Sequence, residues 1–235
     1  MRVIALDSTT RAGSVALVED DCVIDERCGD ASRTHAERLP AEITALAAAH
    51  GVALADVDMY AVASGPGSFT GLRIGIATVQ GFAYVHRRRI AGVPALDALA
   101  HLAAANETSG GLVAAWMDAH RRDVFAALYR VRAGAPFTAG RLETVEAAAV
   151  GDPASILATW RSASLSPRIF VGDGATAFAS DIARAVPDAA IVPAMPLAGA
   201  IGRLAAARAF DAVDPAAVRP LYVRRPDAEI ARDKP

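Results

Sequence analysis

Residues 61–84 read AVASGPGSFTGLRIGIATVQGFAY and combine a strand end, a turn and a helix in one unit. The preceding run, 59–63, is short and apolar, as is typical of a buried strand. Ser64-Gly-Pro-Gly-Ser68 then predicts a sharp turn, because glycine and proline supply the unusual and the fixed dihedral angles that turns need. From Phe69 or Thr70 onward, apolar residues recur at helical spacing, so we expect a helix to begin there.

This helix would contain two interior glycines, Gly75 and Gly81, each of which costs about 1 kcal/mol relative to alanine. Gly71, Gly75 and Thr78 form a stripe of small side chains. We expect close packing on this stripe, either within the chain or across a subunit boundary. The turn also suits an anion, because free N–H groups and the helix dipole converge there. However, neither Gly-x-x-x-x-Gly-Lys-Ser/Thr nor Gly-x-Gly-x-x-Gly is present in this stretch.

The composition is that of an ordinary globular protein, with 235 residues, 53% hydrophobic residues and a net charge of -2. This length suits one large domain or two lobes of about 100 residues. The charge gives no indication of strong nucleic-acid binding by the chain alone. Cys22 and Cys28 are too few for a disulfide framework or a zinc site. No signal peptide is visible and the longest uncharged run, 189–202, is too short for a membrane span, so we expect a soluble cytoplasmic protein.

The N-terminal part of the chain predicts a meander of three strands, at 2–6, 14–19 and 22–27. Asp7, at the end of the first strand, could hold a metal-phosphate group, or it could simply stabilise the turn by bonding its own backbone. Thr34-His-Ala-Glu37 has the form of a capping box and predicts a helix that ends near Gly51. Within it, His35 is either a metal ligand or base, or a surface or interface residue.

The C-terminal part begins after a polar break at 106–111. It predicts a hairpin of strands 112–117 and 124–131 around a charged turn, which echoes the start of the chain. Alternating elements then suggest parallel crossovers: helices near 153–160, 175–185 and 197–210, with strands at 168–171 and 190–192. We expect lobes at 1–106 and 107–214, followed by an arginine- and proline-rich tail, 215–235, in which 219–225 is extended on the body.

Three arginines, Arg87 to Arg89, follow the glycine-containing helix. They would stabilise the helix C-terminus electrostatically, or they could contact a phosphate backbone.

Two lobes that each open with antiparallel strands and an aspartate resemble the actin/hexokinase/Hsp70 type of α/β fold, which is ribonuclease H-like, with a mixed sheet and flanking helices in each lobe. A narrower resemblance, to the bacterial TsaB family, spans nearly the whole chain. It rests on Ile4-Ala-Leu-Asp-Ser-Thr-Thr with Ser14-Val-Ala-Leu, His35 with Leu39-Pro40, Ser64-Gly-Pro-Gly-Ser-Phe-Thr-Gly-Leu-Arg-Ile-Gly75, and Pro220-Leu-Tyr-Val-Arg224.

The resemblance implies a non-catalytic scaffold subunit of the complex that places threonylcarbamoyl on adenosine beside the anticodon of ANN-decoding tRNAs. Its implied partners are a TsaD-like transferase and a TsaE-like ATPase, or a second copy when the chain is alone, with tRNA reached through the complex and no membrane. It implies no cofactor of this chain's own, with ATP used by the partners. Where the transferase carries a His-x-x-x-His metal pair, this chain has Ala95 and Leu99, and His101 alone does not make a metal site.

The family pairs through helices of its N-terminal lobe. We therefore expect the partner or dimer interface at Leu39, Ile43, Leu46, Gly71, Leu72, Gly75, Ile76, Thr78 and Val79. On this hypothesis Gly75→Leu abolishes complex formation and leaves a folded monomer. Weak nucleotide or phosphate binding stays open at Asp7, Ser8, Thr9, Gly65, Gly67 and Ser68.

Two enzyme alternatives also stay open. The first is a small-molecule kinase of the same fold, in which Asp7 holds magnesium and Asp118 or Asp173 serves as base or ligand. Ser8 in place of a glycine would crowd a phosphate there. The second is a peptidase, although the sequence has no His-Glu-x-x-His.

Overall fold

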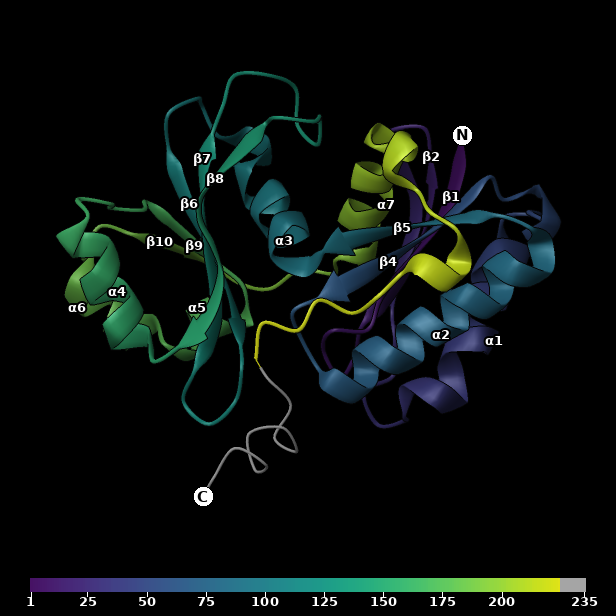
Figure 1. Cartoon of the computed structure of the whole chain (residues 1–235), viewed down its shortest axis with the longest axis horizontal. Helices are drawn as coiled ribbons and strands as arrows, with labels where there is room; N and C mark the ends of the chain where they lie inside the picture. Colours follow the sequence, from purple (N-terminus) through teal and green to yellow (C-terminus); the bar gives the residue numbers. More distant parts are fainter. Residues whose placement is uncertain (225–235) are drawn as a thin grey trace.

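The computed structural model describes residues 1–224, which form two mixed five-stranded sheets with flanking helices (Figure 1). The first sheet has the order β3-β2-β1-β4-β5. Its strands are β1 (Arg2–Asp7), β2 (Ser14–Glu19), β3 (Cys22–Cys28), β4 (Met59–Gly65) and β5 (Arg89–Pro94). The first three strands are antiparallel neighbours, whereas β4 runs parallel to both β1 and β5. The predicted meander is confirmed.

The second sheet repeats this arrangement with the order β10-β9-β6-β7-β8. Its strands are β6 (Leu112–Asp118), β7 (Val124–Val131), β8 (Leu142–Gly151), β9 (Ile169–Val171) and β10 (Ala190–Val192). Again a three-stranded antiparallel meander is extended by parallel strands. The chain thus has the expected two-lobed fold of the actin/hexokinase type, and the echo between its halves is a repeat of topology.

Two helices, α1 (His35–Ala49) and α2 (Phe69–His86), cover one face of the first sheet (Figure 1). Their buried residues pack with alternate residues of the strands, such as Ile4 and Leu6, in one apolar cluster. The predicted capping box of α1 is present, since Thr34 and Glu37 bond each other's backbone groups. Arg87, with a φ of 53°, caps α2 at its C-terminus.

The other face of the first sheet packs against α3 (Ala95–Ala103) and α7 (Ala198–Ala207), which lie between the lobes (Figure 1). One apolar cluster joins residues of both sheets through these helices. The sequence pattern places the segment of α7 in the second lobe, within 107–214. The helix instead packs on β1 and β2, because Gly202 allows a close approach to Val18, only 2.5 Å from a Cβ built at that glycine.

The second lobe also contains α4 (Pro153–Ser162), α5 (Asp173–Ala177) and α6 (Ala179–Ala185), and its outer core is built on Trp116, Trp160 and Phe170. The single helix expected at 175–185 is wrong, because the chain turns at Phe178, whose side chain packs against this aromatic core. Short 3₁₀ turns lie at Leu54–Asp56, Ala104–Asn106, Ala209–Asp211 and Pro215–Ala217.

The tail passes back over the first lobe, where Leu221 N donates to the Ser64 carbonyl oxygen, and residues 218–224 contain no helix or strand. The part of the predicted tail at 225–235 lies outside the described residues. Both cysteines are free and exposed. No helix within residues 1–224 is long and apolar enough to cross a membrane.

Candidate functional site

The glycines of the Gly-Pro-Gly turn (residues 64–68) and of α2 allow α2 to lie directly on the end of β1. A Cβ built at Gly75 would lie 2.0 Å from Ser8 Oγ, and one built at Gly71 would lie 2.2 Å from the Ser8 carbonyl oxygen. A Cβ built at Gly67 would lie 2.5 Å from the Thr9 Cβ. The small stripe is therefore explained by packing within the chain, one of the two explanations that the sequence left open.

Asp7 is buried where α2 and the Gly-Pro-Gly turn pack on the end of β1. It is 3% exposed, and its Oδ1 accepts hydrogen bonds from Thr9 N at 2.8 Å and Thr9 Oγ1 at 2.7 Å. Burial raises the pKa of the Asp7 carboxyl above its usual range, against the lowering effect of these bonds. The carboxylate thus stabilises the turn between β1 and β2, which is the role that the turn chemistry predicted.

An open cleft of about 1080 Å³ lies between the two lobes. The first lobe contributes residues 9–11, 32–35 and 66–72, and the second contributes 117–121 with Asp173. Among the residues predicted to bind nucleotide, Thr9, Gly67 and Ser68 line this cleft, whereas Asp7, Ser8 and Gly65 do not. Ser68 is already engaged, since its Oγ accepts from Gly71 N and its amide donates to the Thr9 carbonyl.

The two acidic residues of the kinase alternative lie on the second-lobe side of the cleft. Asp173 Oδ1 accepts from the backbone amides of Asp118, at 3.0 Å, and Gly174, at 2.8 Å. Asp118 Oδ1 accepts from the His120 amide at 2.8 Å. Both carboxylates therefore support backbone turns, and the third member of the kinase set, Asp7, is buried outside the cleft.

His35 lines the cleft but uses both ring nitrogens internally. Its Nε2 lies 3.0 Å from the Thr10 carbonyl oxygen and its Nδ1 lies 2.8 Å from Arg38 Nη2. Nε2 must therefore donate and Nδ1 must accept, which defines the neutral tautomer. Burial and the neighbouring Arg38 lower the pKa of His35. A histidine held in this way has no free nitrogen for a metal ion.

Most of the predicted interface is not on the surface. The leucine, isoleucine and valine side chains of the predicted interface are at least nine-tenths buried in the chain's own first lobe. Gly71 and Gly75 are also buried, and Thr78 is half-buried. The prediction selected the apolar side of both helices, but this side builds the monomer core. The Gly75→Leu expectation is also wrong in its premise, because a larger side chain at Gly75 would collide with Ser8 inside the monomer.

The outward face of α2 was not among the residues predicted from the sequence. It presents Tyr84, 81% exposed, and Val85, 72% exposed, near Gly81. Apart from its chain neighbours and the nearby backbone of α2, no atom of the described residues lies within 4 Å of a Cβ built at Gly81. Gly81 was visible in the sequence as an interior helix glycine, but the exposure of the two large apolar side chains beside it is seen only in the structure.

Ala95 and Leu99, which the family resemblance set against a metal pair of the transferase, lie in the core between the lobes. Ala95 and Leu99 are 0% and 1% exposed, respectively. His101 is 2% exposed and stacks on Phe137 with ring centroids 5.7 Å apart. Within residues 1–224, no three His, Cys, Asp or Glu side chains gather as a metal site would require.

Comparison with known proteins agrees with this architecture. The family model described as TsaD, tRNA N6-adenosine threonylcarbamoyltransferase, matches residues 29–232. The structure of YeaZ from Pseudomonas aeruginosa superposes with a TM-score of 0.74 at 29% identity, covering 94% of this chain and 99% of that one. The Escherichia coli tRNA threonylcarbamoyladenosine biosynthesis protein TsaB is 36% identical over 55% of each chain. The chain belongs to the TsaB family.

A further relative, an uncharacterized protein of Mycobacterium tuberculosis, is 32% identical over 97% of this chain and 93% of its own length. The likeness to this relative therefore extends over both lobes. Family membership supports a role in tRNA threonylcarbamoyladenosine biosynthesis.

Proposed function

We propose that this chain is a non-catalytic, activating subunit of the cytoplasmic complex that installs threonylcarbamoyl on adenosine in tRNA. Membership of the TsaB family is the observation that carries this proposal. The chain would pair with a TsaD-like transferase and work with a TsaE-like ATPase, and it would form a homodimer in their absence.

The absence of catalysis by this chain is supported by the geometry of its residues. Asp7, the residue best placed in the sequence to hold a metal-phosphate group, is buried and engaged by Thr9. Ala95 and Leu99 offer no metal ligand, and both ring nitrogens of His35 have partners within the chain. The proposal therefore assigns the chemistry to the partner.

We assign the partner contact to the outward faces of α1 and α2. On α1 this face includes three exposed small residues, Ala41, Ala45 and Ala48. On α2 it contains Gly81, Tyr84 and Val85. Exposed small residues allow a partner's backbone to come close, and large apolar residues beside them supply the burial that drives association. The same face would be used for the transferase and for a second copy.

The test is reconstitution. The chain is combined with its TsaD-like and TsaE-like partners, the carbamoyl-adenylate synthase, ATP, threonine, bicarbonate and tRNA, and modified nucleoside is measured with and without the chain. The proposal expects product only in its presence, and neither product nor ATP consumption by the chain alone. Equal product without it would overturn the proposal.

A further inference from the structure

The last described residues lie directly on the Gly-Pro-Gly turn. Leu221 N donates to the Ser64 carbonyl oxygen at 2.7 Å. A Cβ built at Gly65 would lie 2.6 Å from the Leu221 carbonyl oxygen, so this glycine is needed for the contact. The φ of 122° at Gly65 adds a second reason, because other residues rarely adopt it.

The next contact ties the tail to the first turn of α2. The Tyr222 ring stacks on Phe69 with centroids 5.1 Å apart, and Arg73 Nε donates to the Tyr222 hydroxyl at 2.8 Å. The Arg73 guanidinium also lies 3.9 Å from the centre of the Phe69 ring. Tyr222 is thus held by a stacking contact and a hydrogen bond on the first lobe.

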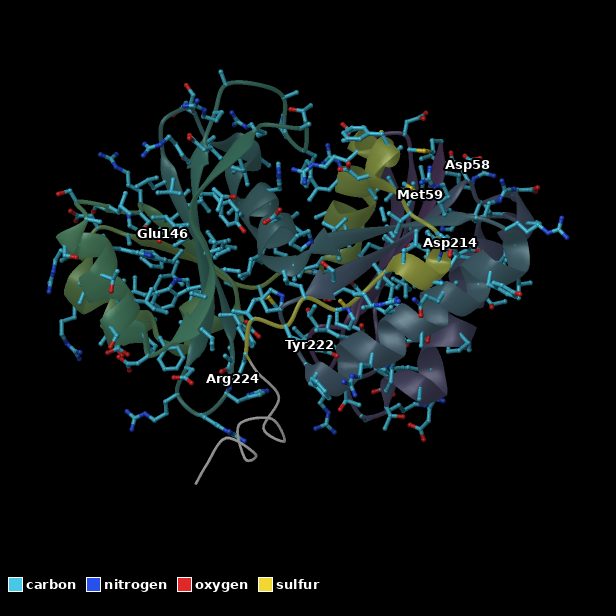
Figure 2. All side chains as sticks on the ribbon, in the orientation of Figure 1. Asp58, Met59, Glu146, Asp214, Tyr222 and Arg224 are labelled. Atoms are coloured by element: carbon cyan, nitrogen blue, oxygen red, sulfur yellow. The ribbon has the colours of Figure 1, made fainter. Side chains whose placement is uncertain are left out.

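Two residues further on, Arg224 reaches the second lobe (Figure 2). Its Nη1 donates to the Ala119 carbonyl oxygen at 2.6 Å, and its Nη2 pairs with the Asp123 carboxylate. Ala119 and Asp123 belong to the hairpin turn between β6 and β7. Because residues 221–224 line the interlobe cleft, the tail spans it from one lobe to the other.

The β6–β7 hairpin, which Arg224 contacts, has an unusual backbone conformation. His120, Arg121 and Arg122 all have left-handed φ angles, of 58°, 56° and 69°, a region that residues with side chains rarely enter. Such a conformation persists only where the surroundings hold it. Arg224 bonds both sides of the turn, at Ala119 and Asp123, so the tail helps to hold the hairpin in this form.

The lobes are joined differently at the opposite end of β7. There the connection to β8 inserts Phe137, 2% exposed, between the His101 ring and the Arg203 guanidinium, which lies 3.8 Å from the Phe137 ring centre. His101 is on α3 and Arg203 is on α7, so Phe137 packs against both of the helices that lie between the lobes. The contact between the lobes is therefore buried core at the Phe137 end, and at the other end it is bridged by the partly exposed tail.

We propose that residues 218–224 are a latch across the interlobe cleft, and that the lobes separate about the buried end when Arg224 leaves the β6–β7 hairpin. This inference goes beyond the proposed function and does not depend on any partner. The tail regulates entry to the cleft because it must detach from Asp123 and Ala119 before the lobes can move apart.

Distance measurement between the lobes tests the latch in the full chain. Cys22 and Cys28 are replaced by serine, and spin labels are placed at two exposed alanines, Ala55 in the first lobe and Ala158 on α4. Arg224→Ala and, from the other side of the ion pair, Asp123→Asn should each broaden the interlobe distance distribution and shift it to longer values.

Arg219→Ala is the matched control, because its guanidinium bonds only carbonyls of its own segment, Ala216 and Val218, in the described structure. It should leave the distances unchanged. Hydrogen exchange supplies a second readout: Arg224→Ala should speed amide exchange in residues 119–123 by about tenfold while β1 and β6 stay protected. Unchanged distances and unchanged exchange in Arg224→Ala, with a folded circular dichroism spectrum, would overturn the proposal.

Discussion

Gly75 and Ser8 are in such close contact that a methyl group on Gly75 would overlap the Ser8 hydroxyl, with 2.0 Å between Cβ and Oγ. This contact brings α2 against the carboxyl end of β1 and, with Gly67 on Thr9, covers Asp7. Asp7, the residue that the sequence offered for a metal-phosphate group, is therefore buried in a packed turn.

Substitution of the two interior glycines of α2 should have opposite effects on the monomer. Gly75→Ala should lower the free energy of unfolding by about 1–3 kcal/mol, because the added methyl group overpacks the Ser8 contact. Gly81→Ala should raise it by up to about 1 kcal/mol, because the site is open and alanine is the better helix former. Urea unfolding of the two variants measures both values, and equal effects would contradict this account of the glycines.

Association should depend on the outward face of α2. Val85→Asp places a charge at the proposed contact and should weaken binding to the transferase partner by about 30-fold or more, the loss expected at a central interface residue. Phe210→Asp is the matched control, since Phe210 is 77% exposed but lies outside α1 and α2. Titration calorimetry compares them. The assignment of the interface fails if both variants bind like the unmodified chain.

Phe137 should be a main contributor to the joining of the lobes. Phe137→Ala removes a buried aromatic side chain and should destabilise the protein by about 3 kcal/mol. A double-mutant cycle with Arg203→Ala should give a coupling of about 0.5–1 kcal/mol from the cation–π contact. Denaturant unfolding of the four proteins measures these terms, and a coupling of zero would contradict the contact.

His101 should make the protein sensitive to mild acid. Burial, with Arg208 and Arg141 nearby, lowers the pKa of His101 to about 4. Between the unfolded value of about 6.5 and this value, only the unfolded chain binds the proton, so stability falls as pH decreases, by on the order of 3 kcal/mol in total. His101→Leu should therefore flatten the dependence of unfolding free energy on pH from 6.5 to 4. Parallel curves for the two proteins would refute this.

The sequence predicted the elements with strong patterns. The three-strand meander, the capping box at Thr34 and the helix after the Gly-Pro-Gly turn were all confirmed, because each is encoded by local periodicity or turn chemistry. β8 was missed because its alanine- and glutamate-rich sequence has neither strong strand propensity nor clear alternation. The position of α7 on the first sheet depends on long-range packing that no local pattern records.

The interface residues predicted from the sequence lie on the inward faces of α1 and α2, which build the core of the first lobe. An apolar stripe on a helix predicts burial, and the prediction could not distinguish a partner's surface from the chain's own sheet. The apolar stripe of α2 is used within the chain, because α2 packs on β1 and β4. What distinguishes the outward face is an excess of exposed apolar area at Tyr84 and Val85, which requires the structure to see.

We propose that this chain promotes threonylcarbamoyl transfer by contact through α2, without chemistry of its own. The most direct test is the yield of modified nucleoside in the reconstituted reaction with the unmodified chain, with Val85→Asp and with Phe210→Asp. The account predicts full product with the unmodified chain and Phe210→Asp, and product close to the chain-free level with Val85→Asp. Equal product in all three reactions, or in a reaction lacking the chain, would contradict it.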